Sequence, residues 1–277
     1  MPELPEVETI RRDLDREFAG KKVKAVQITG ARSVRRGTQD ELTKRLVGRT
    51  FKAAKRRGKY VVVVLDSGDW LVFHLRMSGQ LLKAPAKTPK PKHTHVVIEF
   101  TQGNQLRFVD PRTFGEIFVV DPARLPEVAP DLADLGWDPL EDPLPWGDFA
   151  RLVLSRRQQL KALLTDQKTI AGLGNIYSDE VLHLAGLRYD RLSNTLTVQE
   201  VRRLFRALIE VVHEAIGARG SSLADEQYVD LSGRPGAYQL HHQVYAREGK
   251  ACPRCRATIE RTKWGGRSTF YCPECQV

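Results

Sequence analysis

The sequence has no apolar run approaching the ~18 residues that cross a bilayer, and its N-terminus lacks the apolar stretch of a signal peptide. It has only four cysteines in 277 residues. We therefore expect an intracellular protein, and in a reducing compartment these cysteines are not expected to form disulfides. The sequence also has no internal repeat, which excludes a solenoid.

What the chain does have is positive charge. Hydrophobic residues make up 41% and charged residues 28%, as in a soluble globular protein of one large domain or two ordinary ones. The net charge of +10 and a pI near 9.6 favour a polyanionic partner, with nucleic acid the first choice. A membrane surface is less favoured, because no basic amphipathic helix with a wide apolar face is found.

The first residues, Met1-Pro2-Glu3-Leu4-Pro5-Glu6-Val7-Glu8, indicate amine chemistry. We expect Met1 to be removed because Pro2 is small, which leaves a secondary amine beside the Glu3 carboxylate. A terminal amine titrates near ~8 and a lysine near ~10.4, so far more of the terminal amine is neutral and nucleophilic. The alternative is that Met-Pro arose by chance and that the acids only suit a helix N-terminus.

The first half of the chain predicts a helix that ends before Gly20, followed by β-structure. Closely spaced β-rich runs with short turns indicate an antiparallel sandwich or flattened barrel. The predicted strands are Val23–Thr29, Tyr60–Leu65, Trp70–Leu75, Val96–Phe100, Gln105–Val109 and Glu116–Val120. Lys83–Lys92, rich in proline and lysine, is expected to be a mobile loop.

A proline-dense stretch, Asp121–Pro145, is the predicted domain boundary. Helical patterns follow it, including a longer helix opened by a capping box at Thr197-Val-Gln-Glu200. We expect an α+β protein with domains at 1–130, 131–240 and 241–277. These are an N-terminal β-sandwich with a helix, a helical domain and a four-cysteine finger.

The cysteines form two Cys-x-x-Cys pairs separated by sixteen residues, 256–271. This spacing predicts a four-thiolate zinc site joined by a hairpin, in which the metal is structural because no position is open for water. The ligands are Cys252, Cys255, Cys272 and Cys275. Arg267 lies near the hairpin tip, where it either contacts phosphate or is a solvated turn residue.

Three further motifs carry weaker signals. The glycine turn Ile170–Tyr177 brings Asn175 and backbone amides to a helix start, as a phosphate cradle or a plain helix turn. Arg156 and Lys161 precede it and are candidates for the same cradle. In Asp110–Gly115, an apolar wedge and a cation are suited to an opened base step, although most Asp-Pro turns have no such role.

Taken together and in order, these motifs resemble the formamidopyrimidine-DNA glycosylases, bacterial enzymes that excise oxidised purines such as 8-oxoguanine. The resemblance runs from Pro2 to Cys275. The residues that carry it are Pro2–Glu8, Lys59, Met77, Asp110–Gly115, Gly172–Asn175 and the hairpin with Arg267. It implies a sandwich, a helix-two-turn-helix domain and a zinc finger around a DNA cleft.

The resemblance also implies residue roles. Pro2 attacks C1′ of a flipped nucleotide, Glu3 relays protons, Lys59 serves β-elimination and Arg267 aids δ-elimination. DNA contacts are expected from His74, Met77, His93, Arg112, Phe114, Arg156, Lys161 and Asn175. Lesion contacts are expected from Glu6, Arg234 and Tyr238, with the loop Leu231–Leu240 closing over the base. The partner is double-stranded DNA with oxidised purines or abasic sites, bound by a monomer with one structural zinc in the bacterial cytoplasm at the nucleoid.

Two residues depart from the expected pattern. Arg76 stands where a small residue is expected, and Arg234 stands where a lysine is common. The competing interpretations are a relative of endonuclease VIII, which removes oxidised pyrimidines, and a non-enzymatic DNA-binding module.

Overall fold

The computed structural model describes residues 1–223 and 227–277, which form two compact units. Unit 1 comprises Met1–Asp134 and Ala218–Ala237, and unit 2 comprises Leu135–Gly217 and Tyr238–Val277. The three contiguous domains expected at 1–130, 131–240 and 241–277 divide the chain differently. The difference arises because the segment 218–237 follows the longest helix of unit 2 yet packs in unit 1.

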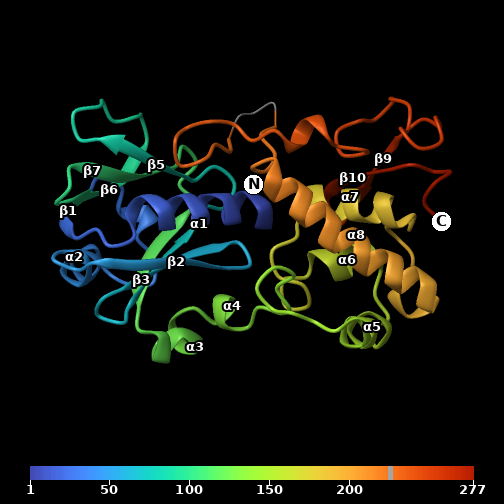
Figure 1. Cartoon of the computed structure of the whole chain (residues 1–277), viewed down its shortest axis with the longest axis horizontal. Coiled ribbons are helices and arrows are strands. Elements are labelled where there is room, and N and C mark those ends of the chain that lie inside the picture. Colours follow the sequence, from blue (N-terminus) through green and yellow to red (C-terminus); the bar gives the residue numbers. More distant parts are fainter. Residues whose placement is uncertain (224–226) are drawn as a thin grey trace. The chain divides into compact units, whose positions relative to one another are not determined.

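Unit 1 is a sandwich of two antiparallel four-stranded sheets (Figure 1). One sheet has the order β1-β6-β7-β5 and the other β2-β3-β4-β8. The strands are β1 (Val23–Ile28), β2 (Phe51–Arg57), β3 (Tyr60–Leu65), β4 (Trp70–His74), β5 (Gln80–Pro85), β6 (Thr94–Phe100), β7 (Asn104–Val109) and β8 (Glu116–Val120). The predicted sandwich is confirmed.

The described residues of unit 1 also form four α-helical segments and two 3-10 turns. In unit 1 they are α1 (Leu4–Phe18), η1 (Ala31–Ser33), α2 (Gln39–Leu46), η2 (Pro122–Arg124), α3 (Leu125–Val128) and α4 (Pro130–Ala133). Helix α1 packs against β2 and β3, and its apolar face enters the core.

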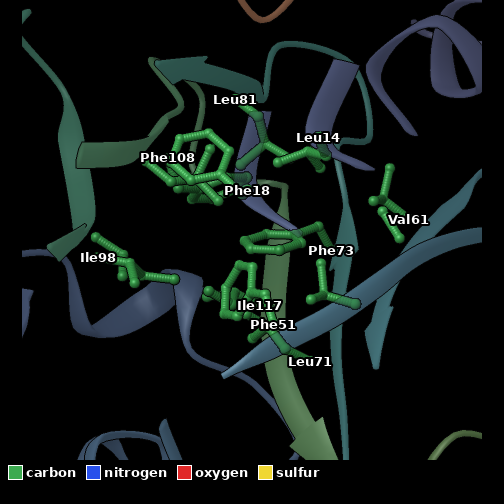
Figure 2. Packing of buried hydrophobic residues seen from close by; sticks show 14 of the residues in the cluster. Leu14, Phe18, Phe51, Val61, Leu71, Phe73, Leu81, Ile98, Phe108 and Ile117 are labelled. Carbon is green, nitrogen blue, oxygen red and sulfur yellow. The ribbon is translucent and has the colours of Figure 1, made fainter. Parts of the chain in front are cut away.

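The core of unit 1 lies between the two sheets and is rich in phenylalanine (Figure 2). Phe18 of α1 and Phe51 of β2 both contact Phe100 of β6, with ring centroids 4.7 and 5.0 Å apart. One helix and both sheets therefore share a single apolar cluster, which makes the start of α1 a rigid part of the sandwich.

Unit 2 is helical and ends in a two-stranded hairpin. Its elements are α5 (Trp146–Leu154), α6 (Leu160–Thr165), α7 (Asn175–Ala185), η3 (Ser193–Thr195), α8 (Val198–Gly217), η4 (Tyr238–Leu240), β9 (Glu260–Trp264) and β10 (Arg267–Tyr271). The predicted capping box of α8 is present, with the Thr197 and Glu200 side chains each accepting from the other residue's amide at 3.3 and 2.8 Å.

Three elements differ from the sequence prediction. Strand β2 and helix α2 were not predicted, and strand β5 occupies the first residues of the expected loop at Lys83. Strand β5 forms despite its lysine and proline because it pairs along its whole length with β7. Among the described residues, no helix is long and apolar enough to cross a membrane.

Candidate functional site

In unit 1, helix α1 begins at the Pro2-Glu3 pair. Glu3 is the N-cap residue, and its amide donates to the Glu6 carboxylate at 2.8 Å. Both glutamates are buried, at 3% and 1% exposure. The capping box therefore holds the chain start in one conformation at the positive end of the helix dipole.

Pro2 is buried, whereas Met1 is 42% exposed. With Met1 attached, the Pro2 nitrogen is an acylated amide that has no basic lone pair. Removal of Met1 would convert this nitrogen to a secondary amine with a free lone pair. The amine would then lie at a helix N-terminus, where the dipole favours its neutral form.

The turn that carries Lys59 is fastened to α1 by a buried arginine. Arg56 donates to Glu8 Oε2 at 3.3 Å and to the Gly58 carbonyl at 2.9 Å, and its side chain is fully buried. Burial raises the pKa of Glu8, but bonds from Arg11, Arg12 and Arg56 hold it below its ordinary value. This charged anchor brings the Lys59 turn to the first turns of α1.

A second group in unit 1 joins two chain segments thirty-five residues apart. The Arg112 guanidinium lies 3.9 Å from Met77 Sδ and 5.1 Å from the centre of the Phe114 ring. Phe114 is 49% exposed, which is unusual for so large an apolar side chain. Met77, Arg112 and Phe114, all three predicted to contact DNA, therefore lie together in one cluster at the surface.

Asp110 builds this cluster. It is completely buried and accepts bonds from the Arg112 amide at 3.2 Å, the Gly115 amide at 2.7 Å and the Ser78 hydroxyl at 2.5 Å. Asp110 belongs to the motif Asp110–Gly115, but no role was predicted for it. An aspartate two residues before an exposed arginine is the signal of an Asx turn that could have identified it.

His74 and Arg76, next to this cluster, have structural surroundings. Burial, then the charges of Arg76 and Lys59, lower the pKa of His74 to about 3, so this 6%-exposed side chain is neutral. His74 was predicted to contact DNA, whereas in this structure its ring is buried against Tyr60, with the ring centroids 4.2 Å apart. Arg76 donates to Glu116 at 2.8 Å, which accounts for an arginine where a small residue was expected.

His93 is exposed and directly precedes β6, as a DNA contact requires. In unit 2, Arg156 is also exposed. Both positions are compatible with the predicted contacts.

In unit 2, the glycine turn leads into α7 and meets the hairpin. Asn175 is the first residue of α7, and its amide nitrogen donates to the Ser268 carbonyl of β10 at 2.8 Å. Ser268 is adjacent to the exposed Arg267. The helix N-terminus and Asn175 of the predicted phosphate cradle therefore lie beside the hairpin strand that carries Arg267, for which a phosphate contact was predicted separately.

Lys161 is bonded to two residues next to this cradle, Asn175 and Asp179. It is 1% exposed, ion-paired with Asp179, and donates to the Asn175 carbonyl at 3.2 Å. Asp179 in turn accepts from the Phe270 amide of β10 at 3.0 Å. Lys161 was predicted to join the phosphate cradle directly, whereas in this structure its ammonium group is buried and bonded to Asp179 and Asn175.

The three predicted lesion-contact residues do not share one unit. Glu6 and Arg234 belong to unit 1, where Glu6 is buried and Arg234 is ion-paired with Asp230. Tyr238 belongs to unit 2 and is 3% exposed, with its ring 5.7 Å from that of Tyr177. Tyr238 packs inside unit 2 in this structure, and its lesion contact stays a prediction.

The four cysteines are arranged to bind one metal ion. Their sulfur atoms all lie within 4.8 Å of one another. Cys252 and Cys275 sulfurs are 3.9 Å apart, and those of Cys255 and Cys272 are 3.4 Å apart. Sulfurs around a tetrahedral zinc are about 3.8 Å apart, so the donor set fits one structural zinc.

Three family models match the chain in succession. They are the formamidopyrimidine-DNA glycosylase N-terminal domain at residues 1–117, its H2TH domain at 135–227, and a zinc finger found in FPG and IleRS at 249–277. Together they account for all three kinds of structure described above.

Full-length relatives agree with these matches. A formamidopyrimidine-DNA glycosylase from Pelotomaculum thermopropionicum is 42% identical over 277 residues, covering 100% of this chain and 99% of the relative. The Lactococcus lactis Fpg in complex with DNA containing an abasic site has a TM-score of 0.90 at 34% identity, covering 99% of both chains. A MutM structure with carbocyclic 8-oxo-G DNA has a TM-score of 0.89 at 33% identity, again covering 99% of both.

Proposed function

The chain belongs to the formamidopyrimidine-DNA glycosylase family, and from this membership we propose that Pro2 carries out its chemistry as the N-terminal amine. The protein is a base-excision repair glycosylase for oxidised purines, with DNA as its partner and one structural zinc.

In the first step the Pro2 nitrogen, freed by removal of Met1, attacks C1′ of the extruded nucleotide. Its lone pair forms the new C–N bond, and the bond to the base breaks with the electron pair and a proton leaving on the base. Opening of the sugar ring at O4′ then yields a cationic imine. Glu3, at the same helix end, delivers the proton to O4′ and stabilises the positive charge.

The lyase steps remove the imine from the DNA. Abstraction of a C2′ proton lets the 3′ phosphate leave, and a second elimination releases the 5′ phosphate. Lys59 serves the proton transfers of the first elimination. Arg267 and Asn175 hold backbone phosphate, and Arg156 and His93 add further contacts, which orient the strand without reading its sequence.

Met77, Arg112 and Phe114 fill the space left by the extruded nucleotide. Extrusion costs stacking and pairing energy, which inserted side chains offset. Arg112 supplies hydrogen-bond donors for the base left unpaired. Because the substrate is genomic DNA, we also propose that the protein acts in the bacterial cytoplasm at the nucleoid.

One observation carries the proposal: Pro2 and Glu3 are held at the N-terminus of a helix that is built into the sandwich core. The alternative, a DNA-binding module without catalysis, gives no reason for an amine precursor and a carboxylate at that place.

The test is borohydride reduction in the presence of DNA with an abasic site. We expect the protein with its Met1 removed to become covalently linked, with mass spectrometry locating the adduct on Pro2. A non-cleavable N-terminal extension should abolish trapping, while the same extension at the C-terminus should leave it intact. Trapping that survives the N-terminal extension, or an adduct on a lysine, would reject the role of Pro2.

A further inference from the structure

Unit 2 contains a pocket of about 430 Å³, a volume within the range of small-ligand sites. Its walls come from α7, from α8, which packs against α7, and from the chain between η4 and the first cysteine pair (Figure 1). Of the described residues that line it, only Tyr238 was predicted to contact DNA or the lesion. The polar lining includes Glu210, Glu214, His183, Tyr238, His241 and Arg254.

Two carboxylates of α8 make this pocket negative. Glu210 and Glu214 lie one helical turn apart, and both are exposed. In the part of the chain that the structure describes, neither is ion-paired. Burial, followed by the charges of three glutamates that line the pocket, raises the pKa of Tyr238. Like charges at this spacing on a helix repel each other, so the pair lacks a cation that would relieve the repulsion.

A buried histidine is a second feature of the pocket, independent of the carboxylates. His183 of α7 lines the pocket and is 2% exposed. Its Nε2 lies 3.4 Å from the Cys252 sulfur, and its Nδ1 is buried with no hydrogen-bond partner within residues 1–223 and 227–277. When Nε2 carries the proton and donates to a thiolate, Nδ1 presents a lone pair. A buried acceptor without a partner is unfavourable, and a donor that enters the pocket would supply the partner.

The aromatic side chains of the pocket suit a flat cation. The His241 ring is stacked on that of Tyr238, with centroids 6.1 Å apart and planes 26° apart. A guanidinium group stacks on aromatic faces and presents five N–H donors in one plane. The arginine that lines the pocket is bonded elsewhere, because Arg254 donates to the carbonyl of Leu184 near the end of α7 at 3.2 Å.

We propose that this pocket binds the guanidinium group of an arginine side chain that projects from a partner protein. Glu210 and Glu214 accept its N–H groups, and His183 Nδ1 accepts one more. Because both glutamates are exposed, the pocket opens at the surface of unit 2, where a projecting side chain reaches it. Carboxylates repel phosphate and attract cations, so this part of a chain with a net charge of +10 selects a basic partner and excludes DNA. Such binding needs none of the chemistry proposed for Pro2.

The experiment titrates the zinc-bound protein, carrying isotope-labelled histidine, with two capped tripeptides. One has arginine between two glycines, and the other has citrulline, which keeps the shape of arginine without its charge. We expect the arginine peptide to bind with a Kd of about 1 mM and the citrulline peptide to bind about tenfold more weakly. The nuclear magnetic resonance signal of His183 Nδ1 should shift with the arginine peptide, while that of His93, which belongs to unit 1, should not.

Replacing the carboxylates is the second measurement. The double variant Glu210→Gln/Glu214→Gln should bind the arginine peptide about tenfold more weakly, because charge-assisted hydrogen bonds become neutral ones. Glu274→Gln, which removes an exposed glutamate of the finger outside the pocket, should change the Kd by less than about twofold. The double variant should still excise 8-oxoguanine within about twofold of the wild-type rate, because neither glutamate has a proposed role in catalysis or DNA contact.

Three outcomes would overturn the guanidinium site. They are no binding of the arginine peptide, equal binding of the citrulline peptide, and an unchanged Kd in the double variant. Free arginine tests the source of the guanidinium group. Its α-carboxylate is repelled by the same glutamates, so it should bind no more tightly than the capped peptide. Tighter binding of free arginine would show that the occupant is a small molecule and would reject a partner protein.

Discussion

A histidine in unit 1 illustrates what burial does to a single residue. His74 packs its ring 4.2 Å from that of Tyr60, and within residues 1–223 and 227–277 its Nδ1 has no hydrogen-bond partner. Burial, followed by the charges of Arg76 and Lys59, lowers its pKa to about 3. The nearby Asp131 acts in the opposite direction and does not restore the ordinary value.

This lowered pKa predicts a loss of stability in mild acid. The unfolded chain binds a proton at His74 near pH ~6.5, before the folded chain does, so the stabilising contribution is full above that pH and is lost as the pH falls toward the folded value. Between about pH 7.5 and about pH 5, His74 should account for about 2 kcal/mol of the decrease in the free energy of unfolding.

Denaturant unfolding of His74→Phe at the two pH values checks this. The variant should lose about 2 kcal/mol less than the wild type over the interval. His213→Ala, at an exposed position on α8, serves as the control and should follow the wild type. Equal losses in His74→Phe and the wild type would contradict the burial argument.

Among the elements, α7 joins most parts of unit 2. Near its start Asn175 bonds to β10, and further along Glu180 accepts the amides of Gln243, Val244 and Tyr245 at 2.8, 3.1 and 2.8 Å. Its third turn places His183 Nε2 3.4 Å from Cys252 Sγ. The helix is thus bonded to the hairpin, to the chain leading into the finger, and to a zinc ligand.

We predict that zinc removal disrupts the hairpin and with it the phosphate cradle. A chelator should weaken DNA binding and change the fluorescence of Trp264, whose indole donates to the Gln159 side chain at 2.7 Å. Arg267→Ala should weaken DNA binding while zinc content and Trp264 fluorescence stay unchanged. If the chelated protein binds DNA as tightly as the zinc form, the finger does not support the cradle.

We also predict that His183 slows the loss of zinc. Its Nε2 lies 3.4 Å from the Cys252 sulfur, and the Nε2-protonated tautomer would donate to a thiolate there. Outer partners of this kind typically affect metal affinity by about tenfold or more. His183→Phe should release zinc to a chromogenic chelator faster by about that factor, with His213→Ala as the control. Equal release rates in the two variants would show that the contact contributes nothing to metal retention.

At the level of the whole molecule, the net charge of +10 predicts salt-dependent DNA binding. Arg156 and Asn175 should differ in kind, because one contact is charged and the other is neutral. Arg156→Ala should reduce the slope of log K against log salt by about one, whereas Asn175→Ala should lower affinity with the slope unchanged.

Binding titrations over a range of salt concentrations measure both effects. Arg124→Ala is a suitable control, because this exposed arginine is ion-paired with Glu127 at 3.0 Å and so contributes little net charge locally. A slope that falls equally in the Arg124 and Arg156 variants would indicate a general charge effect with no specific phosphate contact.

Much of the fold was predictable from local pattern. The predicted strands between Val23 and Val120 are present, because β-branched and aromatic runs bounded by turns need no distant information. The capping box at Thr197 and the cysteine cluster were also predicted from the sequence and are present in the structure. Strand β2 was missed because its sequence, Phe51–Arg57, contains four cations and owes its conformation to pairing with β3.

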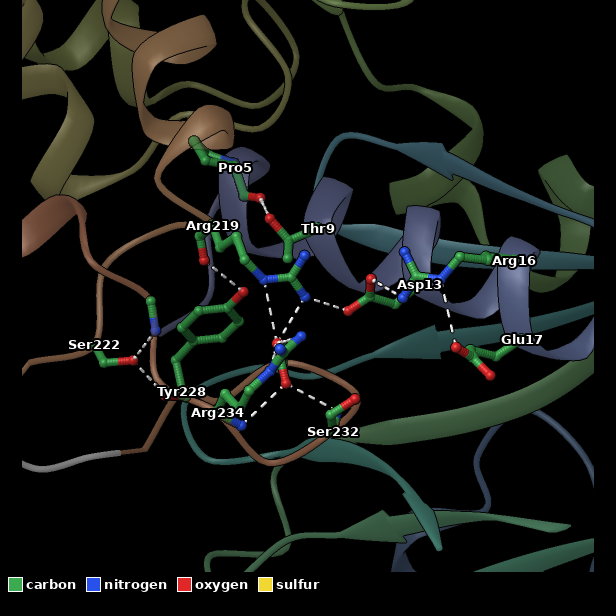
Figure 3. A network of polar contacts seen from close by, with 12 residues as sticks. Pro5, Thr9, Asp13, Arg16, Glu17, Arg219, Ser222, Tyr228, Ser232 and Arg234 are labelled. Atoms are coloured by element: carbon green, nitrogen blue, oxygen red, sulfur yellow. Dashed lines mark hydrogen bonds and ion pairs between the residues drawn. The ribbon is translucent and has the colours of Figure 1, made fainter.

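The candidate site was predictable only in part. Residue identity and spacing alone predict some of its functional groups. These are the amine of Pro2, the carboxylate of Glu3, the amide of Asn175 and the four cysteine thiolates. The ion pairs that Arg219 forms with Asp13 and Asp230 (Figure 3) were not predictable, because Asp13 lies far from the other two residues in the chain and no local pattern marks any of the three.

The order of residues was thus sufficient for the sandwich, the zinc ligands and the basic character, and for predicting an amine at the chain start, because these depend on near neighbours or on composition. Folding decided which charged and polar groups are enclosed: Lys161 and His74 became internal, and Arg219 and Ser221 were bonded to α1. The physical reason is that burial and ion pairing depend on which surfaces pack together, and that is a property of distant parts of the chain.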